Sequence, residues 1–341
     1  MKRLLNTLYL TRQDAWLHRE GETLVVEKDG EMLLKVPVCA LNSVVTFGNV
    51  LVSPWALGLC MERGIAVSML TEQGKFLARV EGAVAGSVHL RLAQVRAYES
   101  QPIKDELARS FVMGKVCNVR SVLSRCVRDH GESERLLAAL EAQNSVLKRL
   151  RDSSLEARSV RGLEGEAASS YFSAFNDMIC SQKDYFAMTS RNRRPPMDPM
   201  NAVLSFLYTL LAHDCRGALE GVGLDPQIGF LRELRSGRPS LALDLMEEFR
   251  APMAERVALS LVNLRQLSSK DFQISETGMV QIKEDGKKKL LMAWQEKKKE
   301  ELVHPFLKEK VPLGLLPHVQ AMLLGRYFRG DLDAYPPFLL R

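Results

Sequence analysis

The stretch Gly86-Ser-Val-His-Leu-Arg-Leu-Ala-Gln94 divides this chain, because the period of its hydrophobic pattern changes there from two residues to 3.6. Before it, short runs of β-forming side chains alternate with turn pairs such as Asp29-Gly30. After it, leucine, alanine and charged residues recur at helical spacing. We therefore expect an α+β protein in which a β-rich part precedes a larger helical part, with the boundary between residues 82 and 97.

Local signals refine this division. The expected strands are Thr7–Leu10, Ala15–His18, Thr23–Glu27, Met32–Val36, Val44–Phe47, Ile65–Leu70 and Phe76–Val80. Ser53-Pro54 and Asp198-Pro199 are typical helix starts, and the second of these helices should end at the Gly221/Gly223 pair. Gly131 is expected to break a long helix, and residues 272–282 to form a small hairpin.

Composition indicates an ordinary globular protein that does not enter a membrane. The chain has 341 residues, of which 46% are hydrophobic and 26% charged, and no apolar run approaches the 18 residues of a membrane span. The run at Met1–Leu10 is too short for a signal peptide and lacks a small-residue cleavage site. Six single cysteines without a C-x-x-C pair favour reduced thiols. We predict a cytoplasmic location.

The charge balance permits a polyanionic partner. The net charge is +6, and residues 1–95 hold 10 Lys and Arg against 9 Asp and Glu. The remainder of the chain therefore holds 37 against 32 and carries +5 of the +6. If nucleic acid binds, the helical part is the expected surface.

An acidic helix is predicted within Gly237–Arg250, which reads GRPSLALDLMEEFR. At about 100° per residue, Asp244, Glu247 and Glu248 share one arc of the helix, while leucine, methionine and phenylalanine fill the other side. Like charges at this spacing repel one another. The arc therefore needs a cation, either arginine or a divalent metal, unless these acids only complement the helix dipole.

A second carboxylate falls on an apolar stripe. Helical rotation aligns Glu164 with Ala168, Tyr171 and Phe175, whereas Glu166 points to the far side. A carboxylate among apolar side chains is costly unless it is paired or binds a metal. Glu164 is therefore the functional candidate, either as a metal ligand or in a buried Glu–Arg pair, and Glu166 is expected to be a surface acid.

Basic segments offer candidate phosphate contacts. Arg191, Arg193 and Arg194 precede a predicted helix N-terminus, where guanidinium and backbone N–H groups can bind phosphates together, although the loop can equally be a solvated turn. The lysines at 287–289 and 297–299 alternate with glutamates, which favours a solvated helix face over DNA contact.

Motifs of several enzyme classes are missing from the sequence. There is no Gly-rich phosphate loop, Walker lysine or G-x-S-x-G elbow, which argues against NTPases, dinucleotide enzymes and serine hydrolases. The histidines show no H-E-x-x-H spacing, and His213 is expected to be a packed or surface residue rather than a ligand.

Taken together, these segments resemble the CRISPR-associated protein one family, the metal-dependent DNA integrases that insert new spacers. The similarity covers nearly the whole chain in the family's order and is closest to the members of type I-C systems. The matching pieces are Phe47-Gly-Asn-Val, Ser53-Pro54, Gly74-Lys-Phe, Ala78-Arg79, Gly86-Ser-Val-His-Leu-Arg-Leu-Ala-Gln, Arg161-Gly-Leu-Glu-Gly-Glu-Ala-Ala, Arg193-Arg-Pro-Pro-Met-Asp-Pro-Met-Asn-Ala, Gly223-Leu-Asp-Pro and the acidic segment from Gly237.

The resemblance implies the architecture and the partners. A β-sandwich-like domain over residues 1–85 would dimerise, residues 86–97 would form the linker and the start of the first long helix, and residues 98–341 would form an all-α domain that binds metal and DNA. The implied partners are CRISPR-associated protein two and double-stranded DNA, as prespacer and as CRISPR repeat. The implied chemistry is phosphodiester transesterification by a prespacer 3′-OH, with Mg²⁺ or Mn²⁺ polarising the phosphate.

The same resemblance implies site residues. Glu164 matches the first metal ligand and Glu247 the third, and Asp244 matches an acid that lines the site. Glu248 is then expected to be a surface acid. We expect the DNA contacts to come from Arg191, Arg193, Arg194, Arg238 and Arg250.

One position departs from the family pattern. The second ligand is a histidine in the family, whereas this chain has Arg232 after Gly229-Phe-Leu. A guanidinium stays protonated and cannot ligate a metal. Our hypothesis is that Arg232 forms ion pairs with Glu164 and Glu247 and weakens or abolishes metal binding. The alternative to an active integrase is therefore a DNA-binding scaffold. A third hypothesis is an unrelated RNA-binding helical protein.

Overall fold

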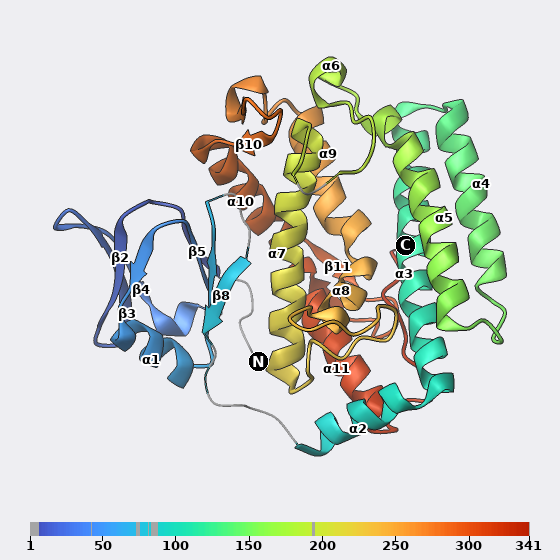
Figure 1. Cartoon of the computed structure of the whole chain (residues 1–341), viewed down its shortest axis with the longest axis horizontal. Helices are drawn as coiled ribbons and strands as arrows, with labels where there is room; N and C mark the ends of the chain where they lie inside the picture. Colours follow the sequence, from blue (N-terminus) through green and yellow to red (C-terminus); the bar gives the residue numbers. More distant parts are fainter. Residues whose placement is uncertain are drawn as a thin grey trace.

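A β-rich part and a helical part make up the protein, as the prediction of an α+β fold with the strands first required (Figure 1). The computed structural model describes residues 7–41, 43–72, 76–80, 82, 88–192 and 195–340. In these residues the last N-terminal strand ends at Val80 and the next helix begins at Val88. The domain limits at residues 85 and 97 stay predictions.

Two four-stranded sheets form the β-rich part, with strand orders β4-β3-β2-β6 and β1-β5-β7-β8. They combine antiparallel hairpins such as β2–β3 with parallel pairs such as β1–β5. Apolar side chains from both sheets, including Leu17, Leu24, Val44 and Val67, share one small core. The strands are β1 (Thr7–Leu10), β2 (Ala15–Glu20), β3 (Thr23–Lys28), β4 (Glu31–Pro37), β5 (Ser43–Phe47), β6 (Val50–Val52), β7 (Ala66–Leu70) and β8 (Phe76–Val80).

All expected strands are confirmed to within two residues, and β6 was not predicted because it has only three residues. Helix α1 (Pro54–Glu62) follows it and begins as predicted, since the Ser53 hydroxyl accepts a hydrogen bond from the backbone N–H of Ala56 at 3.1 Å.

The helical part is built around two long helices. They are α3 (Gln101–His130) and α7 (Pro199–Val222). Asp198 caps α7 through the N–H of Asn201 at 2.7 Å, and Gly223 ends it with a φ of +89°, as predicted. The other helices are α2 (Val88–Glu99), α4 (Glu134–Arg149), α5 (Ala157–Ala174), α6 (Lys183–Phe186), α8 (Ser240–Leu245), α9 (Arg256–Asn263), α10 (Glu284–Lys299) and α11 (Leu316–Phe328).

The expectation of an all-α second domain is corrected by two small hairpins. The predicted one is β9 (Phe272–Ile274) with β10 (Val280–Ile282), and the other is β11 (Glu301–Val303) with β12 (Lys310–Pro312). The second hairpin was not predicted because its three-residue strands are too short for an alternating pattern.

The predicted solvated lysine face of α10 is also wrong in part. Lys287, Lys297 and Lys298 are buried, and the ammonium group of Lys298 pairs with both carboxylate oxygens of Asp214 at 3.0–3.1 Å. In the described residues, no helix is both long and apolar enough to cross a lipid bilayer.

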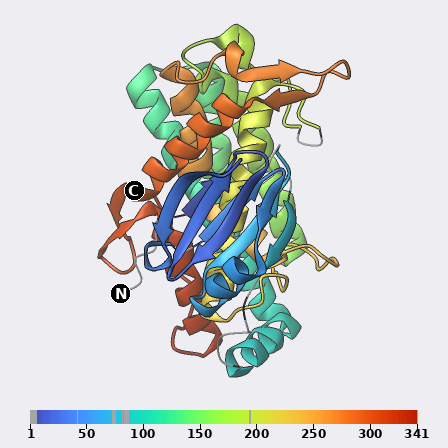
Figure 2. The same cartoon turned by 90° about the vertical axis from the view of Figure 1, so that its left-hand side faces the viewer.

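The β1-β5-β7-β8 sheet packs against α7, and Figure 2 looks onto the strands from the side away from the helices. The rings of Phe47 on β5 and Phe206 on α7 stack with centroids 5.7 Å apart. The Ser68 hydroxyl on β7 bonds to Nδ1 of His213 on α7 at 3.1 Å. Burial, together with the charge of the nearby Arg79, lowers the pKa of His213 to about 4. His213 is therefore a neutral packing residue of this junction.

This lowered pKa predicts a loss of stability in mild acid. Unfolded His213 takes up a proton as the pH falls below about 6.5, whereas folded His213 stays neutral until about pH 4. Between about pH 7 and pH 5, urea unfolding should show the wild type losing about 1–2 kcal/mol more than His213→Asn, which has no titrating group there. Equal losses in the two proteins would contradict this assignment.

Candidate active site

The predicted acidic helix is interrupted in the structure, and the interruption shapes the site. Helix α8 ends at Leu245 and continues as a 3-10 turn over Met246–Glu248, followed by a π-helical turn over Arg250–Glu255. Pro252 lies in the second turn and has no N–H to donate to the carbonyl of Glu248. The side chain of Asn118 on α3 donates to that carbonyl instead, at 2.7 Å. The turn is therefore fastened to α3.

Asp244 holds the loop that precedes α8. It is buried, and its Oδ2 accepts hydrogen bonds from the backbone N–H groups of Phe230 at 2.8 Å and Leu231 at 2.9 Å. A Cβ atom at Gly229 would lie 2.7 Å from the same oxygen, so only glycine fits there. Burial raises the pKa of Asp244, although Arg232 counteracts it with a bond from Nη1 to Oδ1 of 2.9 Å.

Glu247 is the centre of the charge network. It is 1% exposed and is surrounded by three cationic side chains. Lys115 Nζ lies 2.8 Å from Oε2, Arg250 Nη1 lies 3.0 and 3.1 Å from the two oxygens, and Arg232 Nη2 donates to Oε1. Burial raises the pKa of Glu247, but Arg250, Lys115 and Arg232 together lower it well below its ordinary value. Both oxygens of this carboxylate are thus engaged.

The predicted ion pair of Arg232 is confirmed with Glu247 but not with Glu164. Arg232 lies between Asp244 and Glu247, and the ammonium group of Lys115 bridges Glu164 and Glu247. The side chains of Glu164 and Arg232 are 25% and 26% exposed, so the site is open to solvent on their side.

Lys115 is the residue that the sequence analysis missed. It lies on the buried stripe of α3, one turn from Phe111 and Val112 on one side and from Val119 on the other. The signal that selected Glu164, a charged side chain in line with an apolar stripe, was present here as well.

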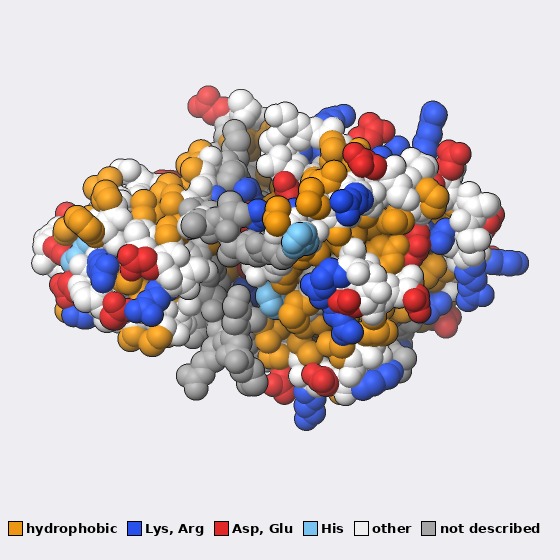
Figure 3. Space-filling view, turned by 90° about the horizontal axis from the view of Figure 1, so that it is seen from below, with side chains coloured by type: hydrophobic (Ala, Val, Ile, Leu, Met, Phe, Trp, Pro, Cys, Tyr) orange, Lys and Arg blue, Asp and Glu red, His pale blue; other side chains and the backbone are white. Residues whose placement is uncertain are grey.

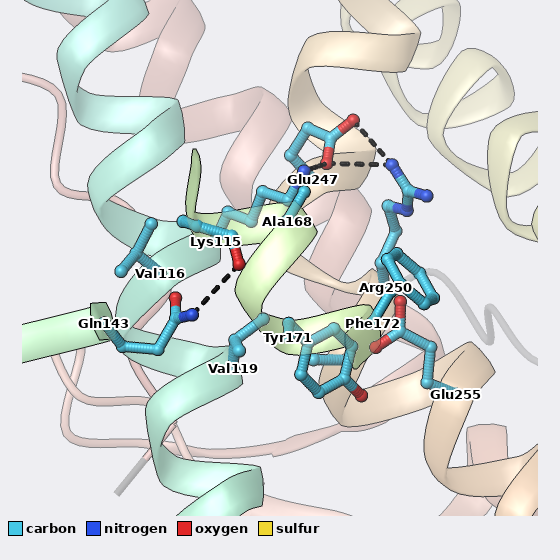
Figure 4. A pocket seen from close by; sticks show the side chains of 12 residues that line it. Lys115, Val116, Val119, Gln143, Ala168, Tyr171, Phe172, Glu247, Arg250 and Glu255 are labelled. Carbon is cyan, nitrogen blue, oxygen red and sulfur yellow. Dashed lines mark hydrogen bonds and ion pairs between the residues drawn. The ribbon is translucent and has the colours of Figure 1, made fainter. Parts of the chain in front are cut away.

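Arg250, which we predicted to contact DNA, pairs with Glu247, and its side chain is 18% exposed. Figure 4 shows Arg250 between Glu247 and the buried Glu255. Its guanidinium is 4.3 Å from the ring centroid of Tyr208, whose hydroxyl donates to Glu255. A cation held over an aromatic face and beside a carboxylate is fixed in place. Arg250 is therefore a largely buried brace for Glu247.

The pocket drawn in Figure 4 is small. It measures about 10 Å³ and lies between Lys115, Tyr171, Glu247, Arg250 and Glu255. That volume corresponds to about one water molecule, so no nucleotide can enter. The partly exposed side chains of Glu164 and Arg232 mark a side from which a phosphate can approach Glu247.

The other arginines that we predicted to contact DNA lie in different environments. The guanidinium of Arg191 bonds to Asn201 Oδ1 at 2.5 Å and lies 5.3 Å from the ring of Tyr208, so it serves inside the helical part. Arg193 and Arg194 lie outside the described residues. Arg238 bonds to the Ser240 hydroxyl at 3.2 Å, at the start of α8.

Of the two predicted surface acids, one is confirmed and one is wrong. Glu166 is exposed and pairs with Arg149 at 2.7 Å. Glu248 is fully buried, because the 3-10 turn rotates it away from solvent and towards the C-terminal residues.

Protein groups already engage most of the carboxylate oxygens that a divalent metal ion would need at this site. The oxygens of Asp244 and Glu247 already accept hydrogen bonds from backbone N–H groups or protein cations, and Arg232 supplies one of these cations to each carboxylate. Within the part of the chain that the structure describes, no group of three or more His, Cys, Asp or Glu side chains is arranged to hold a metal.

Comparison with known proteins identifies the family. The family model described as CRISPR associated protein Cas1 matches residues 8–296. A CRISPR-associated endonuclease Cas1 of Rhodospirillum rubrum is 50% identical, with 99% of each chain covered, and one of Chlorobaculum tepidum is 47% identical over the full length of both. The CAS1 protein of Thermotoga maritima has the same fold, with a TM-score of 0.83 at 22% identity over 97% of this chain and 99% of its own.

The fold and these matches define a CRISPR-associated endonuclease. The chain belongs to the Cas1 family.

The buried position of Arg250 predicts a large loss of stability when its charge is removed. Arg250→Met should lower the free energy of unfolding by about 3 kcal/mol, because it removes one of the cations that compensate the buried Glu247. Arg149→Met, which breaks the exposed pair with Glu166, should cost less than about 1 kcal/mol. Urea unfolding of both variants measures the difference, and similar losses would show that Arg250 is not a buried brace.

Proposed function

We propose that this chain is the strand-joining subunit of CRISPR adaptation, which links prespacer 3′-OH ends to the repeat. The observation that carries the proposal is the convergence of Glu164, Asp244 and Glu247 at one site with an open side. The chain around this site matches Cas1 relatives over 99–100% of its length. A casposase bound to integration product shares the fold, with a TM-score of 0.85 at 21% identity over 98% of this chain and 94% of its own.

The proposed reaction exchanges one phosphodiester for another. The prespacer 3′ oxygen forms a bond to a repeat phosphorus, the bond from that phosphorus to the repeat's own 3′ oxygen breaks, and the proton of the attacking hydroxyl passes overall to the leaving oxygen. On this chain, Arg232 and Lys115 are the cations nearest to an incoming phosphate. Such a phosphate competes with the carboxylates for Arg232, and fixed donors of this kind stabilise developing negative charge.

We further propose that these protein cations weaken the binding of Mg²⁺ or Mn²⁺. Glu164 and Glu247 are the carboxylates that would hold such an ion, which supplies Lewis-acid chemistry in sites of this kind. An ion there must displace Lys115 and overcome Arg232, and two unit charges at 4 Å interact by about 4 kcal/mol at an effective dielectric of about 20.

The ion pairs of Arg232 favour a second candidate, a DNA-binding scaffold that keeps the Cas1 architecture but joins no strands. Backbone phosphate contacts do not require a metal, so DNA affinity can survive the loss of strand joining. The two candidates differ in one measurable property, the formation of a covalent product.

An integration assay separates them. We expect wild-type protein to join labelled prespacer to a supercoiled repeat-bearing plasmid at least about tenfold more slowly than Arg232→His, since an altered metal environment typically costs about 10–100-fold. Calorimetric titration should show Mn²⁺ binding that is tighter in Arg232→His. Duplex binding without joining in the wild type supports the scaffold, and tight stoichiometric Mn²⁺ binding that the variant leaves unchanged would refute the weakening.

The proposed function also implies which molecules this chain binds. Cas1 chains of this fold occur in Cas1–Cas2 complexes, one with a TM-score of 0.84 at 21% identity, covering 100% of this chain and 37% of that one. We propose Cas2 and duplex DNA as partners and the cytoplasm as location. Figure 3 shows Lys and Arg side chains at the outer end of the helical part, interspersed with acidic ones.

We also propose a homodimer through the β-rich part. Trp16 and Leu51 are paired neighbours on β2 and β6, and they are 43% and 62% exposed. Trp55 at the start of α1 is 76% exposed and lines a hollow with Trp16 and His18. Large apolar side chains gathered on one surface typically mark a protein interface.

Light scattering tests the dimer. Trp55→Glu should shift the protein to the mass of a monomer at micromolar concentration, because it places a charge in the apolar surface. The control is Leu264→Glu, since Leu264 is 68% exposed on the helical part and should leave the mass unchanged. A monomeric wild type, or a dimer that survives in Trp55→Glu, would contradict this interface.

A further inference from the structure

The C-terminal segment Tyr335–Leu340 lies against the back of the site. It runs beside α3, where the chain end is marked in Figure 1, and it meets the turn that carries Glu247. Tyr335 and Phe338 are buried, and the ring of Phe338 stacks on that of Phe249 at 5.8 Å. The segment therefore contacts the residues that follow Glu247 in the chain.

Glu248 makes the central contact with this segment. Its Oε1 accepts a hydrogen bond from the Tyr335 hydroxyl at 2.7 Å. Its Oε2 accepts one from the backbone N–H of Phe338 at 2.7 Å and one from Gln320 Nε2 at 3.1 Å. The carboxyl is fully buried and, among the described residues, forms no ion pair with a basic side chain.

Asn118 makes a second contact from α3. Its Nδ2 donates to the carbonyls of Glu248 at 2.7 Å and Phe338 at 2.9 Å, and its Oδ1 accepts from the N–H of Leu340 at 2.6 Å. Asn118 lies three residues after Lys115, which touches Glu247. One side chain therefore ties α3, the 3-10 turn and the C-terminal segment together.

Helix α3, the 3-10 turn and the C-terminal segment are closely packed around Gly114. A Cβ atom at Gly114 would lie 3.0 Å from Glu248 Cγ and 3.1 Å from Pro337 Cβ. An apolar side chain at position 248 could fill this space equally well. A buried carboxyl is costly unless its hydrogen bonds are satisfied. Its three hydrogen bonds join two distant parts of the chain, which an apolar residue could not do.

We propose that Glu248 is a positioning residue that couples the C-terminal segment to the turn of Glu247, so that residues 335–340 form part of the frame of the active site. The coupling itself is a property of the fold, and only the statement that it serves strand joining rests on the proposed function. Burial raises the pKa of Glu248 to about 8, against the lowering effect of its hydrogen bonds to Phe338, Tyr335 and Gln320.

Amide hydrogen exchange followed by mass spectrometry tests the coupling without DNA, metal or activity. Tyr335→Phe removes one hydroxyl and Glu248→Gln one acceptor, and both should speed exchange in residues 244–249 about tenfold relative to the rest of the core. Deletion of residues 335–341 should do so more strongly. If the deletion does not fold, the two point variants decide the question.

Matched controls separate positioning from general loosening. Leu332→Ala removes packing from the same C-terminal region before the segment begins, and Glu166→Gln removes an exposed acid. Neither should change exchange in residues 244–249 beyond the change in global stability. Unchanged exchange in Tyr335→Phe and Glu248→Gln, or an increase no larger than that of Leu332→Ala, would overturn the proposal. A failure of strand joining would leave this result intact.

Discussion

The organisation of the site depends on the compensation of one buried carboxylate. Taking Glu247 out of water costs several kcal/mol unless opposite charges meet it, and the chain supplies Lys115, Arg232 and Arg250 from three separate segments. The requirement for counter-charges at Glu247 therefore restricts where each of these segments can lie. Helix α3 must present Lys115, the loop after Gly229 must present Arg232, and the π-helical turn must present Arg250. The same interaction therefore assembles the site and determines how the surrounding elements pack.

The charges of the site balance without an added ion. Three carboxylates, Glu164, Asp244 and Glu247, face three protein cations, and Asp244 also receives two backbone N–H groups. The cations differ in their surroundings, since Arg250 lies over the ring of Tyr208 whereas Arg232 borders solvent. A phosphate or a metal ion reaching this site would compete with Arg232 and Lys115 and leave Arg250 in place.

Sequence patterns predicted the helices and strands more accurately than they predicted the contacts between distant residues. The strands, the caps at Ser53 and Asp198 and the breaks at Gly131 and Gly223 follow from local preferences, which short segments carry by themselves. Glu248 was wrongly predicted to be exposed because helical geometry was assumed across a turn that becomes 3-10 and then π-helical. Lys115 could have been selected from its place on an apolar stripe, but its partners lie more than 40 residues away, and local periodicity cannot show which residues pair with it.

The ion pairs around Glu247 have a consequence for how the site forms in the cell. A metal centre is completed only when an ion arrives from solution, so its structure follows the free concentration of that ion. Here the counter-charges of Glu247 are attached to the polypeptide itself. The arrangement is then complete as soon as the chain has folded, and neither a chelator nor metal starvation can take these charges away.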